Sequence, residues 1–259
     1  MITWASFPYD GTVVVVTGAG SGIGQAIARA FLENGASICV VGRHEPPLQE
    51  TVQGFPEERV LMRTADVSDR TEVDDMISAV VDRFGRLDVV VNNAGVFEGG
   101  EIDDYDDAAW QRMHGINVDA LLFVARAAMP WLQRSRGNIV AISSVSGMRG
   151  DWGQFAYNAT KGAVNAMVQS LALDAGPHGV RANVIAPAFT ATRLTRDRLD
   201  DPGFAAALAD RVALGRAATP EDVARAVLFV AGPDAGYITG AVIPVDGGTT
   251  ASTGQPRPV

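Results

Sequence analysis

Seven short runs of almost unbroken apolar residues constrain the fold of this chain more than any other feature. The runs are TVVVVTG, SICVVG, VLMRTADV, LDVVVNNAG, GNIVAISS, VRANVIAPA and AVIPVDGG, at residues 12–18, 37–42, 60–67, 87–95, 137–144, 180–188 and 241–248. A strand with one solvated face alternates apolar and polar residues, whereas continuous Val and Ile runs indicate strands covered on both faces. The sequence therefore predicts a sheet buried between two layers.

Amphipathic segments with the period of helices separate these runs. The predicted helices cover residues 23–34, 69–84, 106–114, 117–134, 154–175, 203–213 and 220–231. Gly35 and Gly85 follow the first two, and Pro220 lies in the first turn of the last, as expected at helix boundaries. Strands and helices in strict succession predict the α/β class. We expect a Rossmann-type, doubly wound parallel sheet of about seven strands with helices on both faces.

The pattern continues without a linker, a low-complexity segment or an internal repeat, so we predict one domain over residues 1–259. The stretch 188–215 is less regular and is rich in Arg, Asp and Ala. It leaves the sixth predicted strand at its carboxyl end, where this architecture binds ligands. We therefore predict that residues 188–215 form a substrate lid.

A glycine-rich loop, TGAGSGIGQAIARAF, follows the first predicted strand and opens the first predicted helix. Gly18, Gly22 and Gly24 permit a tight turn, close approach of the backbone to a pyrophosphate, and close packing of helix on strand. The start of the helix then offers backbone N–H groups to the phosphates. This loop in this context predicts a dinucleotide site.

The stretch FAYNATKGAV places Tyr157 four residues before Lys161, on one face of a predicted helix. A neighbouring positive charge lowers the pKa of a phenol, which would suit acid–base catalysis. An ordinary surface tyrosine beside a solvated lysine gives the same Y-x-x-x-K pattern, so the pair alone leaves both interpretations open.

Seven motifs decide between them. The loop has the spacing T-G-x-x-x-G-x-G, and ADVSD, NNAG, ISS, YNATK, NVIAPAFTATRL and ITGAVIPVDGG follow it in order. In this order and at these intervals the motifs resemble the short-chain dehydrogenases/reductases over nearly the whole chain. The resemblance implies an NAD(P)-dependent oxidoreductase that moves a hydride between a nicotinamide and a secondary alcohol or ketone.

The same resemblance implies four catalytic residues: Asn117, Ser144, Tyr157 and Lys161. Tyr157 is expected to exchange a proton with the substrate oxygen, with its pKa lowered by Lys161 and by an oxidised nicotinamide. Lys161 would also bond the nicotinamide ribose, and Ser144 would hold the substrate oxygen. Asn117 would anchor a water of a proton relay. For Ser143 we expect only a strand-end hydroxyl that bonds backbone.

The cofactor contacts implied by the resemblance run from the glycine-rich loop to the end of the sixth strand. Asp66 and Val67 are expected at the adenine end, residues 93–95 beside the adenosine ribose, and the Ile185 backbone with Thr192 at the carboxamide. The full set is Gly18, Ser21, Gly22, Ile23, Gly24, Arg43, Asp66, Val67, Asn93, Ala94, Gly95, Tyr157, Lys161, Pro187 and Thr192.

The end of the second strand bears on the choice of cofactor. An NAD enzyme usually carries an acidic residue there, but this chain has Gly42 followed by Arg43. Without the carboxylate a ribose 2′-phosphate is not repelled, and Arg43 could bind it, so NADP(H) is favoured and NAD(H) is the alternative. Family NADP enzymes often have a second basic residue where this chain has Ser21, and Arg43 could instead point to solvent or stack on adenine.

Three segments, SVSGMRGDWGQFAYNATKGAV, ALGRAATPEDVA and IPVDGGTTASTGQP, resemble the acetoin reductase and 2,3-butanediol dehydrogenase branch. This implies a small vicinal hydroxyketone or diketone as substrate. The expected pocket residues are Val96, Phe97, Ser144, Met148, Trp152, Tyr157 and Ala188. The family's usual Pro-Gly is Pro187-Ala188 here, which either narrows the pocket or needs a backbone without positive φ.

Alternative functions remain at this point. A reductase of 3-oxoacyl thioesters, sugars or steroid-type ketones has the same motifs. A non-catalytic dinucleotide-binding module is a different class, and the complete set of four catalytic residues argues against it.

Composition excludes several other functions. The chain has 21 basic and 30 acidic residues, a formal charge of −9 and no basic run, so nucleic acid and anionic membranes are poor partners. None of the three histidines has a ligand spacing, so we expect no catalytic metal. SVSG is not the G-x-S-x-G of a serine hydrolase.

The compartment and the assembly follow from the remaining features. No signal peptide and no apolar stretch of membrane-spanning length is evident, and Cys39 is the only cysteine, so we expect a soluble cytoplasmic protein. The family resemblance implies a homotetramer.

Overall fold

A computed structural model describes residues 7–193 and 195–255, and the ends of the predicted domain lie outside these ranges. Its centre is a seven-stranded parallel sheet with the strand order β3-β2-β1-β4-β5-β6-β7. The strands are β1 (Val13–Thr17), β2 (Ser37–Gly42), β3 (Val60–Thr64), β4 (Val89–Asn92), β5 (Asn138–Ile142), β6 (Arg181–Pro187) and β7 (Val242–Val245). The predicted doubly wound α/β fold is confirmed.

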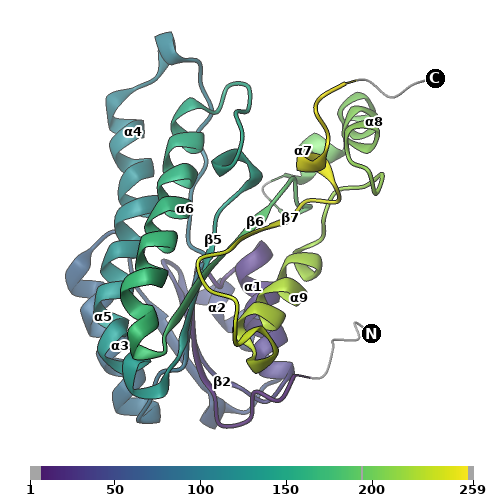
Figure 1. The fold of residues 1–259 in the computed structure, drawn as a ribbon. Coiled ribbons are helices and arrows are strands. Elements are labelled where there is room, and N and C mark those ends of the chain that lie inside the picture. The colour runs from purple at the N-terminus through teal and green to yellow at the C-terminus, as the bar shows by residue number, and fades with distance from the viewer. Residues whose placement is uncertain (1–6, 194, 256–259) are drawn as a thin grey trace.

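Helices cover both faces of the sheet (Figure 1). Those longer than one turn are α1 (Gly22–Glu33), α2 (Glu45–Val52), α3 (Arg70–Phe84), α4 (Asp107–His114), α5 (Ala120–Ser135), α6 (Phe155–Ala175), α8 (Pro202–Arg211) and α9 (Pro220–Ala231), and α7 (Arg196–Leu199) is a single turn. Helix α2 was not predicted, since two adjacent prolines suggest a loop. Its prolines lie in the first turn, where a missing N–H costs nothing.

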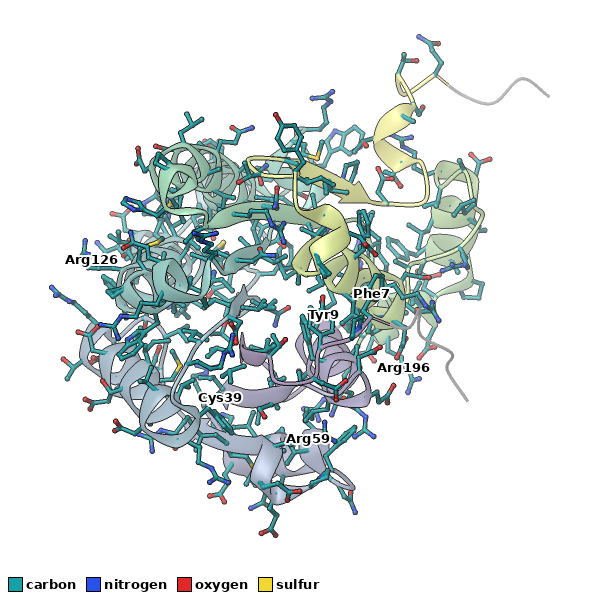
Figure 2. The ribbon with its side chains drawn as sticks, turned by 60° about the horizontal axis from the view of Figure 1, so that its bottom comes forward. Phe7, Tyr9, Cys39, Arg59, Arg126 and Arg196 are labelled. Atoms are coloured by element: carbon teal, nitrogen blue, oxygen red, sulfur yellow. The ribbon has the colours of Figure 1, made fainter. Side chains whose placement is uncertain are left out.

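Successive residues of β1 show why the strand runs are continuously apolar. Val13 and Val15 belong to one core cluster with side chains of α3, α5 and α6. Val14 and Val16 belong to a second cluster with α1 and α9. Both faces of the strand are therefore buried. Figure 2 shows Cys39 of β2 inside the molecule, in the first of these clusters, while Arg126 projects from the surface.

A π-helical turn, Gly115–Asp119, joins α4 to α5 without a break. The sequence had suggested two helices separated near Gly115, because glycine lowers helix propensity. Instead the chain stays helical with one wider turn, a feature often found at functional sites. Asn117 lies in this turn and is only 1% exposed.

The joined helix, residues 107–135, is long and apolar enough by length and composition to cross a membrane. Its inner face carries Leu121, Val124 and Leu132 of the first core cluster, and 39% of its most apolar window is buried. A core helix of a globular domain has the same character.

The ligand crevice of such a sheet lies where the strand order reverses. Here the chain runs outward from β1 to β3 and then returns to place β4 on the other side of β1. The glycine-rich loop after β1 and the residues after β4 therefore meet at this point. Helices α7 and α8 lie beyond β6 and β7, close to the carboxyl-terminal segment (Figure 1).

Candidate active site

The glycine-rich loop is packed so closely that a side chain would not fit at its third glycine. A Cβ atom added to Gly24 would lie 2.2 Å from the carbonyl oxygen of Gly18 and 2.4 Å from the side-chain nitrogen (Nδ2) of Asn93. Gly18 itself has a φ of 65°, which favours glycine. The loop can therefore bring the start of α1 directly against the end of β1.

Thr17, the last residue of β1, ties this loop to the segment after β4. Its hydroxyl oxygen accepts the N–H groups of Asn93 and Ala94, each at 3.0 Å. The Asn93 amide donates back to the Thr17 carbonyl at 2.9 Å. Asn93 thus ties the end of β1 to the segment after β4, and its contact with a ribose stays a prediction. Thr17 was not predicted, and its signal was a hydroxyl residue that ends a run of four valines.

The start of α1 fits an anionic cofactor. Ser21 caps the helix with an extended backbone but makes no side-chain capping bond, and the first N–H groups of a helix have no intrahelical partner. A Cβ on Gly22 would lie 3.2 Å from the Thr192 methyl group, so the glycine keeps a gap between loop and Thr192. Free N–H groups beside an open gap suit a pyrophosphate.

At the predicted adenine end, Asp66 is fixed by its neighbour. Its carboxylate accepts the Ser68 N–H at 2.9 Å and the Ser68 hydroxyl at 2.6 Å. These bonds lower the pKa of Asp66, and the positive charge of Arg43 lowers it further. Arg43 is exposed, and no hydrogen bond or ion pair joins its guanidinium to any residue that the structure describes. Arg43 therefore stands beside the adenine end with its donors available.

The catalytic serine and tyrosine predicted from the motifs lie in contact. Ser144 caps a short 3₁₀ turn, and its hydroxyl oxygen accepts the Ser146 N–H at 3.1 Å. The hydroxyl also hydrogen-bonds Tyr157. Burial raises the pKa of Tyr157, and the bond from Ser144 acts in the opposite direction. The ring of Phe97 packs edge-on against Tyr157, with the ring centroids 5.3 Å apart.

Lys161 lies beneath this pair and is only 5% exposed. Its ammonium donates to the Ile142 carbonyl at 3.0 Å and lies 5.7 Å from the centroid of the Tyr157 ring. Burial lowers the pKa of Lys161 to about 8. Burial raises the pKa of Tyr157 in the protein without cofactor, so the expected lowering by Lys161 and an oxidised nicotinamide stays a prediction.

Asn117 makes three hydrogen bonds, two to the segment after β4 and one to α6. Its carbonyl oxygen accepts the Val96 N–H at 2.8 Å, and its amide donates to the Val96 carbonyl at 3.0 Å and to the Thr160 hydroxyl at 3.1 Å. A Cβ on Gly95 would lie 3.2 Å from this oxygen and 3.4 Å from the Lys161 nitrogen. The glycine therefore leaves room between Asn117 and Lys161, as the predicted water relay requires. Thr160 was not predicted as part of the site.

Two residues predicted for the site lie in settings that differ from the expectation. The Ile185 carbonyl already accepts the Ser143 N–H at 2.8 Å in the middle of β6, and its contact with a carboxamide stays a prediction. Trp152 is 96% exposed in the loop between Asp151 and Gly153, and its contact with a substrate stays a prediction. No pattern in the sequence indicates the direction in which such a loop side chain points. Ser143 is as expected, since its hydroxyl donates to the Lys161 carbonyl at 3.1 Å.

The backbone conformation shows how Ala188 fits at the position where the family usually has glycine. Among the described residues, Arg136 is the one residue other than glycine with positive φ, so Ala188 needs no strained conformation. Pro187 is buried and Ala188 is half-buried beside β7, where its N–H donates to the Val245 carbonyl at 3.2 Å. Met148 is half-buried against the first core cluster.

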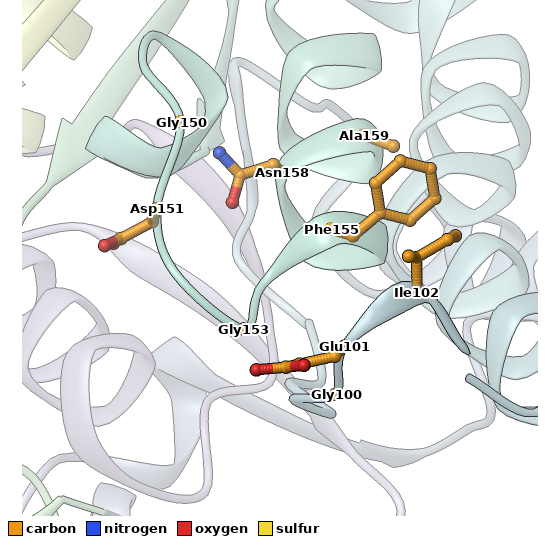
Figure 3. Close-up of a pocket in the computed structure, with 9 residues that line it drawn as sticks. All are labelled: Gly100, Glu101, Ile102, Gly150, Asp151, Gly153, Phe155, Asn158 and Ala159. Carbon is orange, nitrogen blue, oxygen red and sulfur yellow. The ribbon is translucent and has the colours of Figure 1, made fainter. Parts of the chain in front are cut away.

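An open cavity of about 670 Å³ lies beside the site, between the segment at residues 100–102 and the start of α6 (Figure 3). Its lining includes the carboxylates of Glu101 and Asp151, the ring of Phe155 and the amide of Asn158. Within the described ranges, no three His, Cys, Asp or Glu side chains come close enough together to hold a metal ion.

The buried lysine gives a prediction for stability. The pKa of Lys161 is about 8 in the fold and 10.5 in the unfolded chain, which therefore binds more protons between these pH values. The free energy of unfolding should rise with pH across this window, by about 2 kcal/mol relative to a Lys161→Met variant. Denaturant unfolding of both proteins at pH 8 and pH 10 measures the difference. Both proteins contain Cys39, so any titration of this thiol contributes equally to both and drops out of the difference. Equal pH dependence in the two proteins would show that Lys161 titrates normally.

The sheet, the glycine-rich loop at its switch point and the Ser144–Tyr157–Lys161 group define a nucleotide-dependent oxidoreductase. The family model described as "Enoyl-(Acyl carrier protein) reductase" matches residues 18–250. The chain belongs to the short-chain dehydrogenase/reductase family, and it is a short-chain alcohol dehydrogenase or ketoreductase.

Relatives of known name cover almost the full chain. Meso-2,3-butanediol dehydrogenase of Serratia marcescens is 41% identical over 96% of this chain and 98% of its own. Galactitol 2-dehydrogenase (L-tagatose-forming) of Cereibacter sphaeroides is 36% identical over 94% and 97%. The 3-oxoacyl-[acyl-carrier-protein] reductase FabG of Thermotoga maritima is 34% identical over 92% and 98%.

Solved structures agree with the fold. The crystal structure of gox2181 superposes with a TM-score of 0.90 at 32% identity, covering 94% of this chain and 97% of that one. The structure described as ElxO with NADP bound gives a TM-score of 0.88 at 30% identity, covering 93% and 99%. Members of this family bind NAD(P) cofactors.

Proposed function

We propose that this protein reduces small vicinal diketones and hydroxyketones, such as diacetyl and acetoin, and oxidises the matching 2,3-butanediol. The observation that carries the proposal is the arrangement of three side chains: a half-buried Tyr157, the Ser144 hydroxyl that acts to lower its pKa, and the Lys161 ammonium 5.7 Å from the centroid of the phenol ring. The similarity to meso-2,3-butanediol dehydrogenase supports the substrate class.

In the reducing direction Tyr157 donates its proton to the carbonyl oxygen. Burial, which raises the pKa of Tyr157, keeps the phenol protonated and ready for this step. When a substrate is bound, the single O–H of Ser144 can turn to donate a second hydrogen bond to the same oxygen, while the Ser144 oxygen still accepts the Ser146 N–H. The cofactor, when bound at Gly18, Gly22 and Gly24, supplies or accepts the hydride. In the oxidising direction Tyr157 takes the proton back.

The side chains beside Tyr157 suit a compact substrate. Phe97 packs on the phenol ring, and Met148 and Ala188 are half-buried close in sequence to Ser144 and Pro187. Such apolar contacts discriminate weakly, by about 1–3 kcal/mol per methylene. Sugars and acyl thioesters are therefore the alternative substrates, as in the galactitol dehydrogenase and FabG relatives.

Initial rates test the proposal directly. Purified protein is assayed with NADPH and with NADH against diacetyl, acetoin, a 3-oxoacyl thioester and a ketose. We expect the highest kcat/KM with diacetyl or acetoin. Turnover confined to the bulky or polyhydroxylated ketones would reject the small diketone and favour one of the alternatives.

We also propose that NADP(H) is favoured over NAD(H), because Arg43 offers free donors at the adenine end. An Arg43→Ala variant should raise the KM for NADPH by about tenfold, the value of one exposed charge-assisted bond to the 2′-phosphate. The KM for NADH should change by less than about twofold. Arg134, stacked on Trp131 at the far end of α5, supplies the control, since Arg134→Ala removes the same charge away from the site. If the ratio of the KM values for NADPH and NADH were unchanged in the Arg43→Ala variant, NAD(H) would be favoured.

We further propose a cytoplasmic homotetramer in which residues 188–215 act as the lid. Exposed apolar side chains on the helices, such as Leu122 on α5, support association. The carboxyl-terminal segment packs beside the lid, where the Leu214 N–H donates to the Gly247 carbonyl at 3.0 Å. The mass of the native particle tests the assembly.

A further inference from the structure

The turn that follows the catalytic serine is held by two asparagines of α6 that the mechanism does not use. We call residues 144–149 the serine turn. The side-chain amides donate to three of its backbone carbonyl oxygens: Asn158 to Ser146 at 2.7 Å and to Arg149 at 2.6 Å, and Asn165 to Gly147 at 2.9 Å. Figure 3 shows the Asn158 side chain pointing from α6 toward the loop that carries Gly150.

Between the two asparagines, the serine turn rests directly on the backbone of α6. A Cβ atom on Gly147 would lie 2.6 Å from both the carbonyl carbon and the carbonyl oxygen of Lys161. Residues three and four apart share a face of a helix, so Asn158, Lys161 and Asn165 lie in one row. The two asparagines therefore bind the serine turn on either side of its contact with Lys161.

Hydrogen-bond chemistry fixes the orientation of both amides. All three partners are carbonyl oxygens, which only accept, so the NH₂ group of each asparagine must face the turn. The remaining oxygens, Oδ1 of Asn158 and of Asn165, are buried without a hydrogen-bond partner in the described part of the chain. A buried unpaired acceptor costs stability. These two residues are thus poor choices for stability alone and good choices for holding the turn.

The held carbonyls are linked to the Ser144 hydroxyl through one residue. Ser146 gives its N–H to the Ser144 oxygen, and its carbonyl is bound by Asn158. A shift of the turn would therefore rotate the hydroxyl that contacts Tyr157. We propose that Asn158 and Asn165 are positioning residues that clamp the serine turn on α6 and thereby aim the Ser144 hydroxyl at the reacting oxygen. The inference rests on the proposed function, since it assumes that Ser144 and Tyr157 act on a ketone.

Single alanine variants test the clamp. Asn158→Ala and Asn165→Ala should each lower kcat for the best ketone about tenfold, the scale expected from a misplaced catalytic group. The KM for the reduced cofactor should stay within about twofold, because the serine turn meets only the backbone of Lys161 and the two asparagines bind no side chain predicted to hold the cofactor. Asn138 provides the matched control. It is 2% exposed, donates to the Val230 carbonyl at 3.1 Å, has an unpaired Oδ1 and begins β5 at the end remote from the site. Asn138→Ala should lower the melting temperature and leave kcat unchanged.

A Ser144→Ala background separates positioning from general weakening. If the asparagines act through Ser144, their alanine variants should change kcat there by less than about twofold. The same tenfold loss in both backgrounds would overturn the proposal, as would unchanged kcat in the single variants.

Hydrogen exchange provides a readout that does not depend on turnover. Peptides covering the serine turn should exchange faster in Asn158→Ala and Asn165→Ala, and those of β1 should not change. Unchanged exchange in the turn would also overturn the proposal. A wild-type protein that reduced no ketone would reject the proposed function, while the exchange rates would still decide whether the clamp exists.

Discussion

Replacing Tyr157 by Phe should abolish most of the turnover and leave the cofactor bound. The half-buried phenol is the proposed acid of the site, and the Ser144 hydroxyl acts to lower its pKa. General acid catalysis contributes about 100- to 10,000-fold to a rate, so we expect kcat to fall by about a thousandfold. Phenylalanine keeps the ring that packs on Phe97, so the pocket should keep its shape. Stopped assays at high enzyme concentration measure the residual rate.

Tyr105 supplies the control for this experiment. It lies in the segment after β4, and its hydroxyl donates to the Glu98 carbonyl at 3.3 Å, outside the predicted catalytic group. Tyr105→Phe should keep nearly full kcat. The quenching of protein fluorescence by NADPH should give equal dissociation constants for wild type and both variants. If Tyr157→Phe retained its turnover, the proton would come from another group, and the mechanism proposed above would be wrong.

Most of the fold follows from local patterns, because burial on both faces makes the central strands of a parallel sheet continuously apolar. The runs at β1, β2 and β4 showed this without ambiguity. Helix α2 was not predicted, since its two prolines suggest a loop and its position depends on packing. There, Thr51 is fully buried and donates to the Ala19 carbonyl at 2.9 Å, a contact that no local pattern contains.

The site was predictable where a motif fixes both residue type and spacing. Ser144 and Tyr157 are thirteen positions apart in sequence and in contact in the structure, as the family resemblance implied. The supporting residues were not predictable, because they act through backbone groups of distant segments. Thr17, Thr160 and Asn165 are ordinary polar residues in the sequence, and only the fold shows which carbonyl or N–H each one meets.

The direction of a pKa shift can likewise be predicted only when the fold is known. The sequence places a lysine one turn after Tyr157, which suggests that its charge dominates. In the structure Lys161 is buried and bonded to the Ile142 carbonyl, so that desolvation acts on both side chains. Lowering the pKa of Tyr157 for alcohol oxidation must therefore overcome burial, and both the Ser144 hydrogen bond and the positive charge of an oxidised nicotinamide act in that direction.

Replacing Gly24 by Ala should remove cofactor binding while the domain stays folded. The added Cβ would lie 2.2 Å from the Gly18 carbonyl oxygen. The position of each of these two atoms is set by the backbone, so neither can rotate away. The loop must move, so the N–H groups at the start of α1 lose their alignment. We expect the dissociation constant for NADPH to rise about a hundredfold, the loss of about two charge-assisted hydrogen bonds. The overpacking should lower the free energy of unfolding by about 1–3 kcal/mol.

Gly176 at the end of α6 distinguishes a steric effect from a general effect of alanine. It has right-handed helical φ and ψ, and a Cβ there would meet nothing within 4 Å. Gly176→Ala should bind NADPH as the wild type does and unfold at the same or a higher temperature, since alanine restricts the unfolded chain. Titrating NADPH fluorescence with the three proteins, alongside their circular dichroism, gives both quantities. Normal binding by Gly24→Ala would mean that the contact between α1 and β1 can relax. The close approach at Gly18 would then not be what places the helix against the pyrophosphate.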